Sequence, residues 1–164
     1  MTSKLKFALF GNVYQAKKSA SIELLLQQLK LREADLLIDK AFYTYLTQTL
    51  HIDCQPAGLI EHSDFDADIA ISMGGDGTFL EAASRVRNKN IPILGINVGR
   101  LGFLADVSPD EIEDAISDIY EGIYKIDERC VIQVEYVGPS LKGYPYALNE
   151  VAVLKRDNSS MISI

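Results

Sequence analysis

Short apolar runs alternate with amphipathic stretches over most of the chain. The apolar runs have the length of buried strands and cover residues 6–10, 36–39, 68–73 and 91–97. Around them, apolar residues recur at the three- and four-residue spacing that is typical of amphipathic helices. These predicted helices cover residues 21–35, 40–50, 78–88 and 108–122.

Strands that alternate with helices favour a parallel sheet, because each helix returns the chain to the edge where the next strand begins. The pattern predicts an α/β fold, with a Rossmann-like parallel sheet and helices flanking it. Ser19, Thr78 and Ser108 precede three of the helical stretches and are predicted to cap them. At the third of these helices, Pro109 takes the first helical position and Glu111 completes a capping-box sequence.

The pattern changes after Gly122. Residues 130–138 and 144–156 are two strand-like runs with no helical stretch between them. We place a domain boundary near Gly122, with an α/β nucleotide-binding domain in residues 1–122 and the beginning of a β-rich domain in residues 123–164. Because the chain ends inside a strand-like stretch, we expect this all-β domain to be incomplete here.

The composition narrows the possible partners. Apolar residues make up 48% of the chain, enough for a real core, and 16 basic against 23 acidic residues give a net charge of −7. The acidic balance argues against a nucleic-acid partner, and no apolar stretch has the length that spans a membrane. Cys54 and Cys130 lack metal-ligand spacing, so we expect reduced thiols in a cytoplasmic protein.

One stretch, ISMGGDGTF, places three glycines and one aspartate directly after a predicted strand. In parallel sheets this position binds ligands, and the start of the next helix attracts phosphate. Gly74, Gly75 and Gly77 would let a ligand approach the backbone. Asp76 suits a base or a cation contact; the alternative is a tight glycine turn in which Asp76 only begins the helix. The spacing fits neither the Walker nor the Rossmann phosphate loop.

Three motifs together carry a family resemblance. GGDGT after a strand resembles a motif of NAD kinases, diacylglycerol and sphingosine kinases and, as GGDGS, phosphofructokinases. GINVGRLGFLAD, residues 95–106, is similar to the NAD kinase segment G-x-N-x-G-x-L-G-F-L. ALNEVAV, residues 147–153, resembles the Asn-Glu motif of the same family. The motifs follow the order of NAD kinases, and the resemblance covers nearly the whole chain.

The resemblance implies ATP-dependent phosphorylation of the 2′-hydroxyl of the adenosine ribose of NAD, which gives NADP, with a divalent metal expected to be Mg²⁺. It makes Asp76 the general base or the group that orients the hydroxyl, and it has the loop glycines admit phosphate or ribose. Phe103 is expected to contact the adenine. Asn149 and Glu150 are expected to hold ribose hydroxyls and neighbouring polar groups of NAD. No side chain is assigned as a metal ligand, and we expect a homo-oligomer when the protein is full length.

Two alternatives stay open. Lipid kinases of the diacylglycerol or sphingosine type place Asn-Glu directly after the loop, where this chain has residues 79–81 with the sequence Phe-Leu-Glu. A non-catalytic nucleotide-binding domain would keep the glycines but would not need Asp76. The family also bears a glycine- and threonine-rich motif in its second domain that this chain lacks, so we expect the 164-residue chain to be inactive alone.

Overall fold

The computed structural model describes residues 4–13, 19–99, 102–135, 144–148 and 150–152. The chain forms two compact units, residues 1–127 and residues 128–164. The predicted boundary near Gly122 falls at the end of a helix, where Gly122 takes the left-handed conformation with φ of 71°. Each unit is described by itself below.

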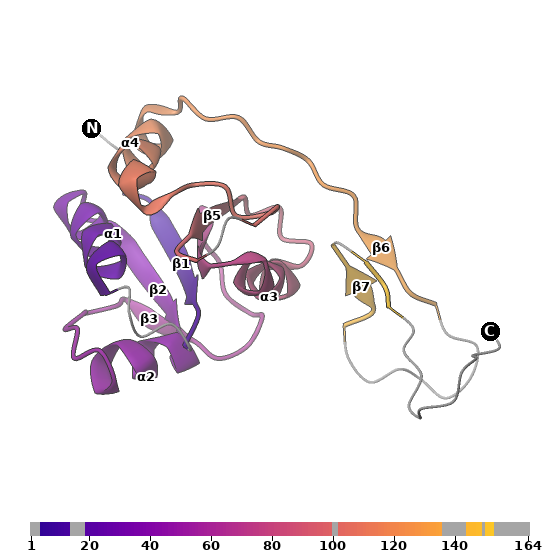
Figure 1. The fold of residues 1–164 in the computed structure, drawn as a ribbon, viewed down its shortest axis with the longest axis horizontal. Helices are drawn as coiled ribbons and strands as arrows, with labels where there is room; N and C mark the ends of the chain where they lie inside the picture. The colour runs from indigo at the N-terminus through magenta and orange to yellow at the C-terminus, as the bar shows by residue number, and fades with distance from the viewer. Residues whose placement is uncertain (1–3, 14–18, 100–101, 136–143, 149, 153–164) are drawn as a thin grey trace. The chain divides into compact units, whose positions relative to one another are not determined.

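The first unit is built on one parallel sheet of five strands (Figure 1). The strands are β1 (Lys6–Gly11), β2 (Asp35–Asp39), β3 (Gly58–Ile60), β4 (Ile69–Gly74) and β5 (Ile93–Asn97). Their spatial order is β3-β2-β1-β4-β5. The four predicted strands are all present, which confirms the α/β class. The sequence pattern missed β3, because three residues at a sheet edge are too few to show a period.

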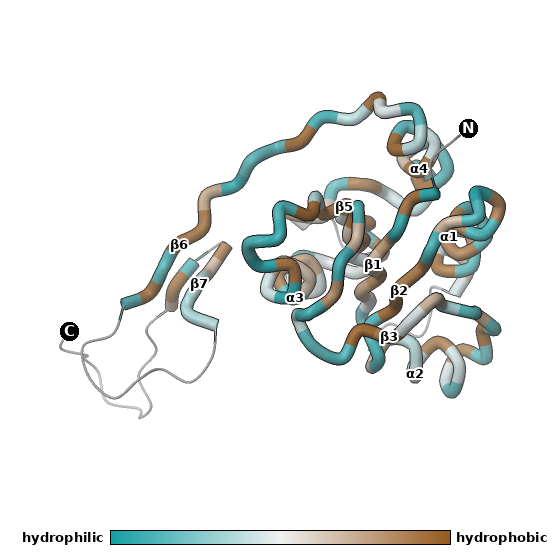
Figure 2. Tube along the Cα trace, turned by 180° about the vertical axis from the view of Figure 1, so that it is seen from behind, coloured by the Kyte–Doolittle hydropathy of each residue, from teal (hydrophilic) through white to brown (hydrophobic). Residues whose placement is uncertain are grey.

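Among the described residues, four α-helices flank the sheet: α1 (Ser19–Leu31), α2 (Lys40–Gln48), α3 (Asp76–Val86) and α4 (Ile112–Glu121). Alternate residues of β1 point to opposite faces. Phe7 and Leu9 pack in one core cluster with residues of α1, α2 and α4, whereas Ala8 and Phe10 pack in a second cluster with residues of α3. Helices therefore cover both faces, and the central strands form a hydrophobic band between them (Figure 2).

The structure confirms one predicted helix cap and contradicts another. Ser108 begins a capping box as predicted: its backbone N–H donates to the Glu111 carboxylate at 2.9 Å, ahead of a 3-10 turn (η1, Pro109–Glu111) and α4. The prediction that Thr78 caps α3 is wrong. The helix starts at Asp76 with Gly75 as N-cap, and Thr78 lies buried in the first turn. Glycine is an accepted N-cap, and an acidic residue is favourable in the first turn.

The strand order reverses between β1 and β4. From β1 the chain runs through α1 to β2 and then to β3, and from β4 it runs through α3 to β5 on the other side (Figure 1). The two strands are neighbours, and the N–H of Asn12, just after β1, donates to the carbonyl oxygen of Met73 near the end of β4 at 3.1 Å. In open α/β sheets, ligands bind beyond the carboxyl ends of the strands at such a switch point.

Within its described residues, the second unit contains one antiparallel pair, β6 (Ile132–Gln133) and β7 (Tyr146–Ala147). The pair lies within the two predicted strand-like runs, but it is much shorter than they are. Part of each run, residues 136–138 and 153–156, lies outside the described residues. A short antiparallel sheet therefore starts where the sequence predicts the β-rich domain.

Candidate nucleotide-binding site

The glycine loop lies at the switch point of the sheet. Gly74 is the last residue of β4, Gly75 is the N-cap of α3, and Asp76 is the first residue of that helix. The Asp76 side chain is therefore placed at the positive end of the helix dipole, where a negative charge is stabilised. The glycine loop and the helix start are neighbours because β4 runs directly into α3.

The Asp76 carboxylate binds the backbone of a turn that follows β5. Its Oδ1 accepts N–H groups from Phe103 at 3.1 Å, Leu104 at 2.9 Å and Ala105 at 3.3 Å. Its Oδ2 accepts only the Phe103 N–H, at 2.9 Å. Two of the three motifs that carry the family resemblance are thus joined by one carboxylate. Since Oδ2 has a single partner among the described residues, it keeps room for another hydrogen-bond donor.

These hydrogen bonds also set the protonation of the carboxylate. The N–H of Phe103 first, and those of Leu104 and Ala105 after it, lower the pKa of Asp76 below its ordinary value of 3.8. Partial burial acts in the opposite direction and is the smaller effect. Asp76 is therefore ionised throughout the neutral range, which the positive end of the helix dipole also favours.

The end of β5 supports the turn. Asn97 is buried, its Nδ2 donates to the Ala105 carbonyl oxygen at 3.4 Å, and its Oδ1 accepts the Gly99 N–H at 2.8 Å. The Asn97 N–H donates to the Val107 carbonyl oxygen at 2.7 Å. The Asn97 side chain therefore connects Gly99, near the start of the segment between β5 and η1, to Ala105 further along it. This is a structural role next to the site.

The loop glycines fall into two kinds. A Cβ on Gly74 would lie 2.6 Å from the Thr78 Cβ, so the packing of the helix start requires glycine there. A Cβ on Gly75 or Gly77 would meet nothing within 4 Å. Gly75 also has a φ of −109°, which any residue can adopt. Neither the packing nor the backbone conformation of this unit explains glycine at Gly75, so the open space is available to a ligand.

Phe103 is directed to solvent. Its side chain is 79% exposed, although its own N–H is bound to Asp76. The ring belongs to neither of the two core clusters. A large exposed aromatic beside a glycine loop can stack on a planar ligand.

The structure brings together Asp76, Gly74, Gly75, Gly77 and Phe103. The structure does not place the Asn-Glu motif relative to these residues. Asn149 lies outside the described residues, and Glu150 belongs to the second unit, where it is exposed. Sequence reasoning missed Gly102, the residue before Phe103. A Cβ on Gly102 would overlap the Asp76 carboxylate. Its place in the motif was visible, but its contact with Asp76 was not.

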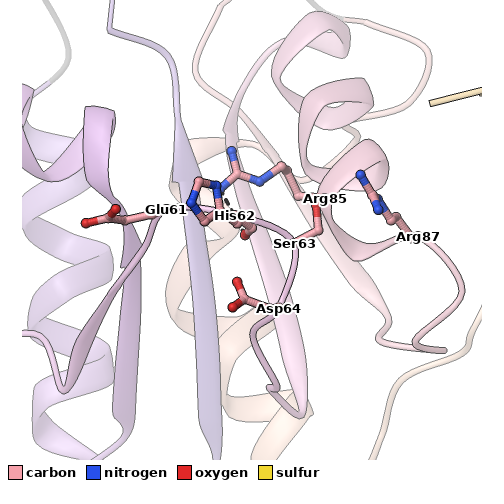
Figure 3. A pocket seen from close by; sticks show the side chains of 6 residues that line it. All are labelled: Glu61, His62, Ser63, Asp64, Arg85 and Arg87. Atoms are coloured by element: carbon pink, nitrogen blue, oxygen red, sulfur yellow. Dashed lines mark hydrogen bonds between the residues drawn. The ribbon is translucent and has the colours of Figure 1, made fainter. Parts of the chain in front are cut away.

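A pocket of about 500 Å³ lies elsewhere, between the loop after β3 and the last turn of α3 (Figure 3). It is lined by Glu61, His62, Ser63, Asp64, Arg85 and Arg87. The Arg85 guanidinium donates to the His62 carbonyl oxygen at 3.1 Å and lies 3.5 Å from the Asp39 carboxylate. Glu61 is paired with Lys40 at 2.9 Å. Arg85 thus ties α3 to the loop after β3 and to Asp39, and Glu61 ties the same loop to α2. These contacts serve the fold, so we do not take the pocket as the candidate site.

No group of three or more metal-ligating side chains occurs within the described part of the chain. None of the helices described there is long and apolar enough to cross a bilayer.

A parallel sheet with its glycine loop at the switch point defines an α/β domain of Rossmann-like type. Residues 10–124 match the family described as "ATP-NAD kinase N-terminal domain". The chain belongs to the NAD kinase family.

Individual relatives agree with this assignment. An NAD kinase of Bacteroides fragilis is 52% identical over 160 residues, which cover 98% of this chain and 55% of the relative. An NAD kinase of Porphyromonas gingivalis is 38% identical over 159 residues, which cover 97% of this chain and 54% of the relative. Among solved structures, a yeast NADH kinase complexed with NADH has the same fold, with a TM-score of 0.64 and 18% identity over 78% of this chain and 41% of that chain. The chain spans about half the length of the curated relatives it matches.

Proposed function

We propose that this chain supplies the α/β part of an NAD kinase, which transfers the terminal phosphoryl group of ATP to the 2′-hydroxyl of the adenosine ribose of NAD. The observation that carries the proposal is the joining of GGDGT to the turn at Phe103 by the Asp76 carboxylate, in a chain of this family. A lipid kinase is not favoured, because the relatives are NAD kinases. A non-catalytic domain is not favoured either, since Asp76 is present.

In this proposal Asp76 acts on the hydroxyl that is phosphorylated. Its Oδ1 is used by three N–H groups, which leaves Oδ2 to accept the hydroxyl proton in a hydrogen bond. A carboxylate with a lowered pKa is a weak base, so it orients the hydroxyl and receives the proton late. Phosphoryl transfer tolerates this, because the transition state needs positioning and charge neutralisation more than a strong base.

The remaining residues would bind the two substrates. The open space at Gly75 and Gly77 lets phosphate or ribose approach the start of α3, where free N–H groups favour anions. The exposed ring of Phe103 provides a surface on which adenine can stack. Asn149 and Glu150 are proposed to hold ribose hydroxyls and polar groups of NAD, as the family motif implies.

A divalent metal fits this site only as a companion of ATP. Asp76 is the one carboxylate at the loop, and Mg²⁺ is commonly held by one or two carboxylates together with substrate phosphates. When bound, Mg²⁺ would neutralise the charge of the transferred phosphoryl group. Three further points remain predictions: a cytoplasmic location, a homo-oligomer and the lack of a nucleic-acid partner.

The test is an assay on a polypeptide of the relatives' length that contains this chain, called the full-length enzyme below. Incubation with ATP, Mg²⁺ and NAD should produce NADP, measured with an NADP-specific dehydrogenase. Omission of ATP or of NAD is the control. Phosphorylation of diacylglycerol or sphingosine without NADP formation would contradict the proposal and favour the lipid kinase.

A further inference from the structure

We propose that Gly102 is a positioning residue for this reaction, because its missing side chain lets the turn 102–105 close on Asp76. The inference rests on the role proposed for Asp76. It concerns a residue that touches the carboxylate but need not touch either substrate.

The space at Gly102 is taken by the carboxylate. A Cβ there would overlap Asp76 Oδ1 and would lie 2.8 Å from Cγ and 3.1 Å from Oδ2. Gly122 is the one described glycine with a positive φ. The requirement at Gly102 is therefore for space and not for a special backbone conformation. At Gly75 and Gly77, by contrast, a Cβ would meet nothing within 4 Å.

The carboxylate cannot move aside without cost. The atom that a Cβ would overlap is Oδ1, which accepts the N–H groups of Phe103, Leu104 and Ala105. An alanine at Gly102 must displace either the Asp76 side chain or the turn itself. Either movement breaks the same set of hydrogen bonds.

The turn fixes two parts of the proposed site at once. It holds Oδ1 and thereby fixes the position of Oδ2, and it carries the exposed ring of Phe103. Displacement of a positioned group by about 1 Å can lower a rate by about 10²-fold. Gly102 thus connects the placement of the acceptor with the placement of the aromatic surface.

The first test measures the turn directly and needs no activity. Carboxyl NMR of the 164-residue chain gives the pKa of Asp76 before and after Gly102→Ala, with Gly58→Ala as the matched control. A Cβ at Gly58 meets only the far end of the Leu37 side chain, at 3.2 Å. A small shift of that flexible methyl group relieves the contact, so the control should fold. We expect Gly102→Ala to raise the pKa of Asp76 toward or above 3.8 and Gly58→Ala to leave it unchanged. An unchanged pKa in Gly102→Ala would overturn the inference.

If Gly102→Ala does not fold, a pH titration of the unsubstituted chain still tests whether the turn holds the Asp76 carboxylate. The backbone amides of Phe103, Leu104 and Ala105 should shift together as pH falls, with one common midpoint below 3.8. Amides that titrate separately, or not at all, would show that the turn does not hold Asp76.

The second test is kinetic and uses the full-length enzyme. Gly102→Ala should lower kcat by about 10- to 10²-fold and move the acid limb of the pH profile to higher pH. Gly58→Ala should leave both unchanged. If the unsubstituted enzyme makes no NADP, the proposed function fails, whereas the NMR result stands by itself. If NADP is made and Gly102→Ala has the original kcat and pH profile, only the inference about Gly102 fails.

Discussion

The two ends of α3 make similar contacts with neighbouring loops but have different surroundings. At the start of the helix, the Asp76 carboxylate binds the turn after β5, and beside it lie open space at Gly75 and the exposed ring of Phe103. At the other end, the Arg85 guanidinium binds the loop after β3 and pairs with Asp39. Each end thus anchors a loop through one charged side chain.

The pocket in Figure 3 lies at the Arg85 end of the helix, away from the proposed site. The pocket of about 500 Å³ near Arg85 is surrounded by groups whose charges serve the fold: Arg85 lies over the Phe10 ring, and the Lys89 ammonium donates to the Ser63 carbonyl oxygen. At the Asp76 end, Gly75 and Gly77 lie beside open space, and the Phe103 ring is exposed. The proposed function places the site at this end and not at the pocket.

The largest effect is expected from Asp76→Asn in the full-length enzyme. An amide cannot replace both carboxylate oxygens as acceptors, so the hydroxyl and the turn lose a partner. We expect kcat to fall by about 10²- to 10⁴-fold, with a circular dichroism spectrum that still shows a folded protein. Asp106→Asn is the control, since Asp106 is exposed in the same segment. A kcat within about threefold of the original would remove Asp76 from the mechanism.

The second prediction separates two glycines of the same loop. Gly74→Ala forces the new Cβ against Thr78 and should lower the free energy of unfolding by about 1–3 kcal/mol. Gly75→Ala meets no atom of the unit and should instead weaken NAD binding by about tenfold, or 1.4 kcal/mol. Urea unfolding and NAD titration of both variants provide the measurements. If Gly75→Ala loses stability and keeps its affinity for NAD, the open space serves the fold.

The third prediction addresses the other end of the helix. Arg85→Met removes the contacts with Asp39 and the His62 carbonyl oxygen while keeping most of the side-chain volume. The free energy of unfolding should fall by about 1.5–3 kcal/mol. The Kd for NAD, measured by calorimetry, should not change. Weaker NAD binding in a folded Arg85→Met variant would mean that the pocket in Figure 3 takes part in the function.

The smallest effect is a pH dependence of stability. The pKa of Asp76 is lower in the folded chain than the ordinary value of 3.8, so the folded state binds fewer protons than the unfolded state in the pH range between the two pKa values. The stabilisation is present above about pH 4 and is lost as pH falls through the folded pKa. Urea midpoints measured from about pH 6 to about pH 3 should decline less steeply in Asp76→Asn than in the original chain. Equal slopes would show that the hydrogen bonds to Asp76 do not form in solution.

The sequence predicted the parts of the fold that depend on local pattern. Buried strands such as β4 show as apolar runs, and the capping box at Ser108 shows as a spacing. The edge strand β3 is too short for a pattern, and the start of α3 was misplaced because Gly75 caps it without a side chain. For the candidate site, the sequence predicted which residues take part but not how they contact one another. The bonds from Asp76 to the turn at Phe103 join residues far apart in sequence through backbone groups, which no side-chain pattern records.

We expect NAD to bind at the Asp76 end of α3, and a titration of the full-length enzyme with NAD, followed by backbone amide NMR, tests this. The amides of residues 74–78 and 102–105 should shift, while those of residues 61–64 and 85–87 should stay in place. Shifts confined to residues 61–64 and 85–87 would contradict it and would move the site to the pocket at Arg85.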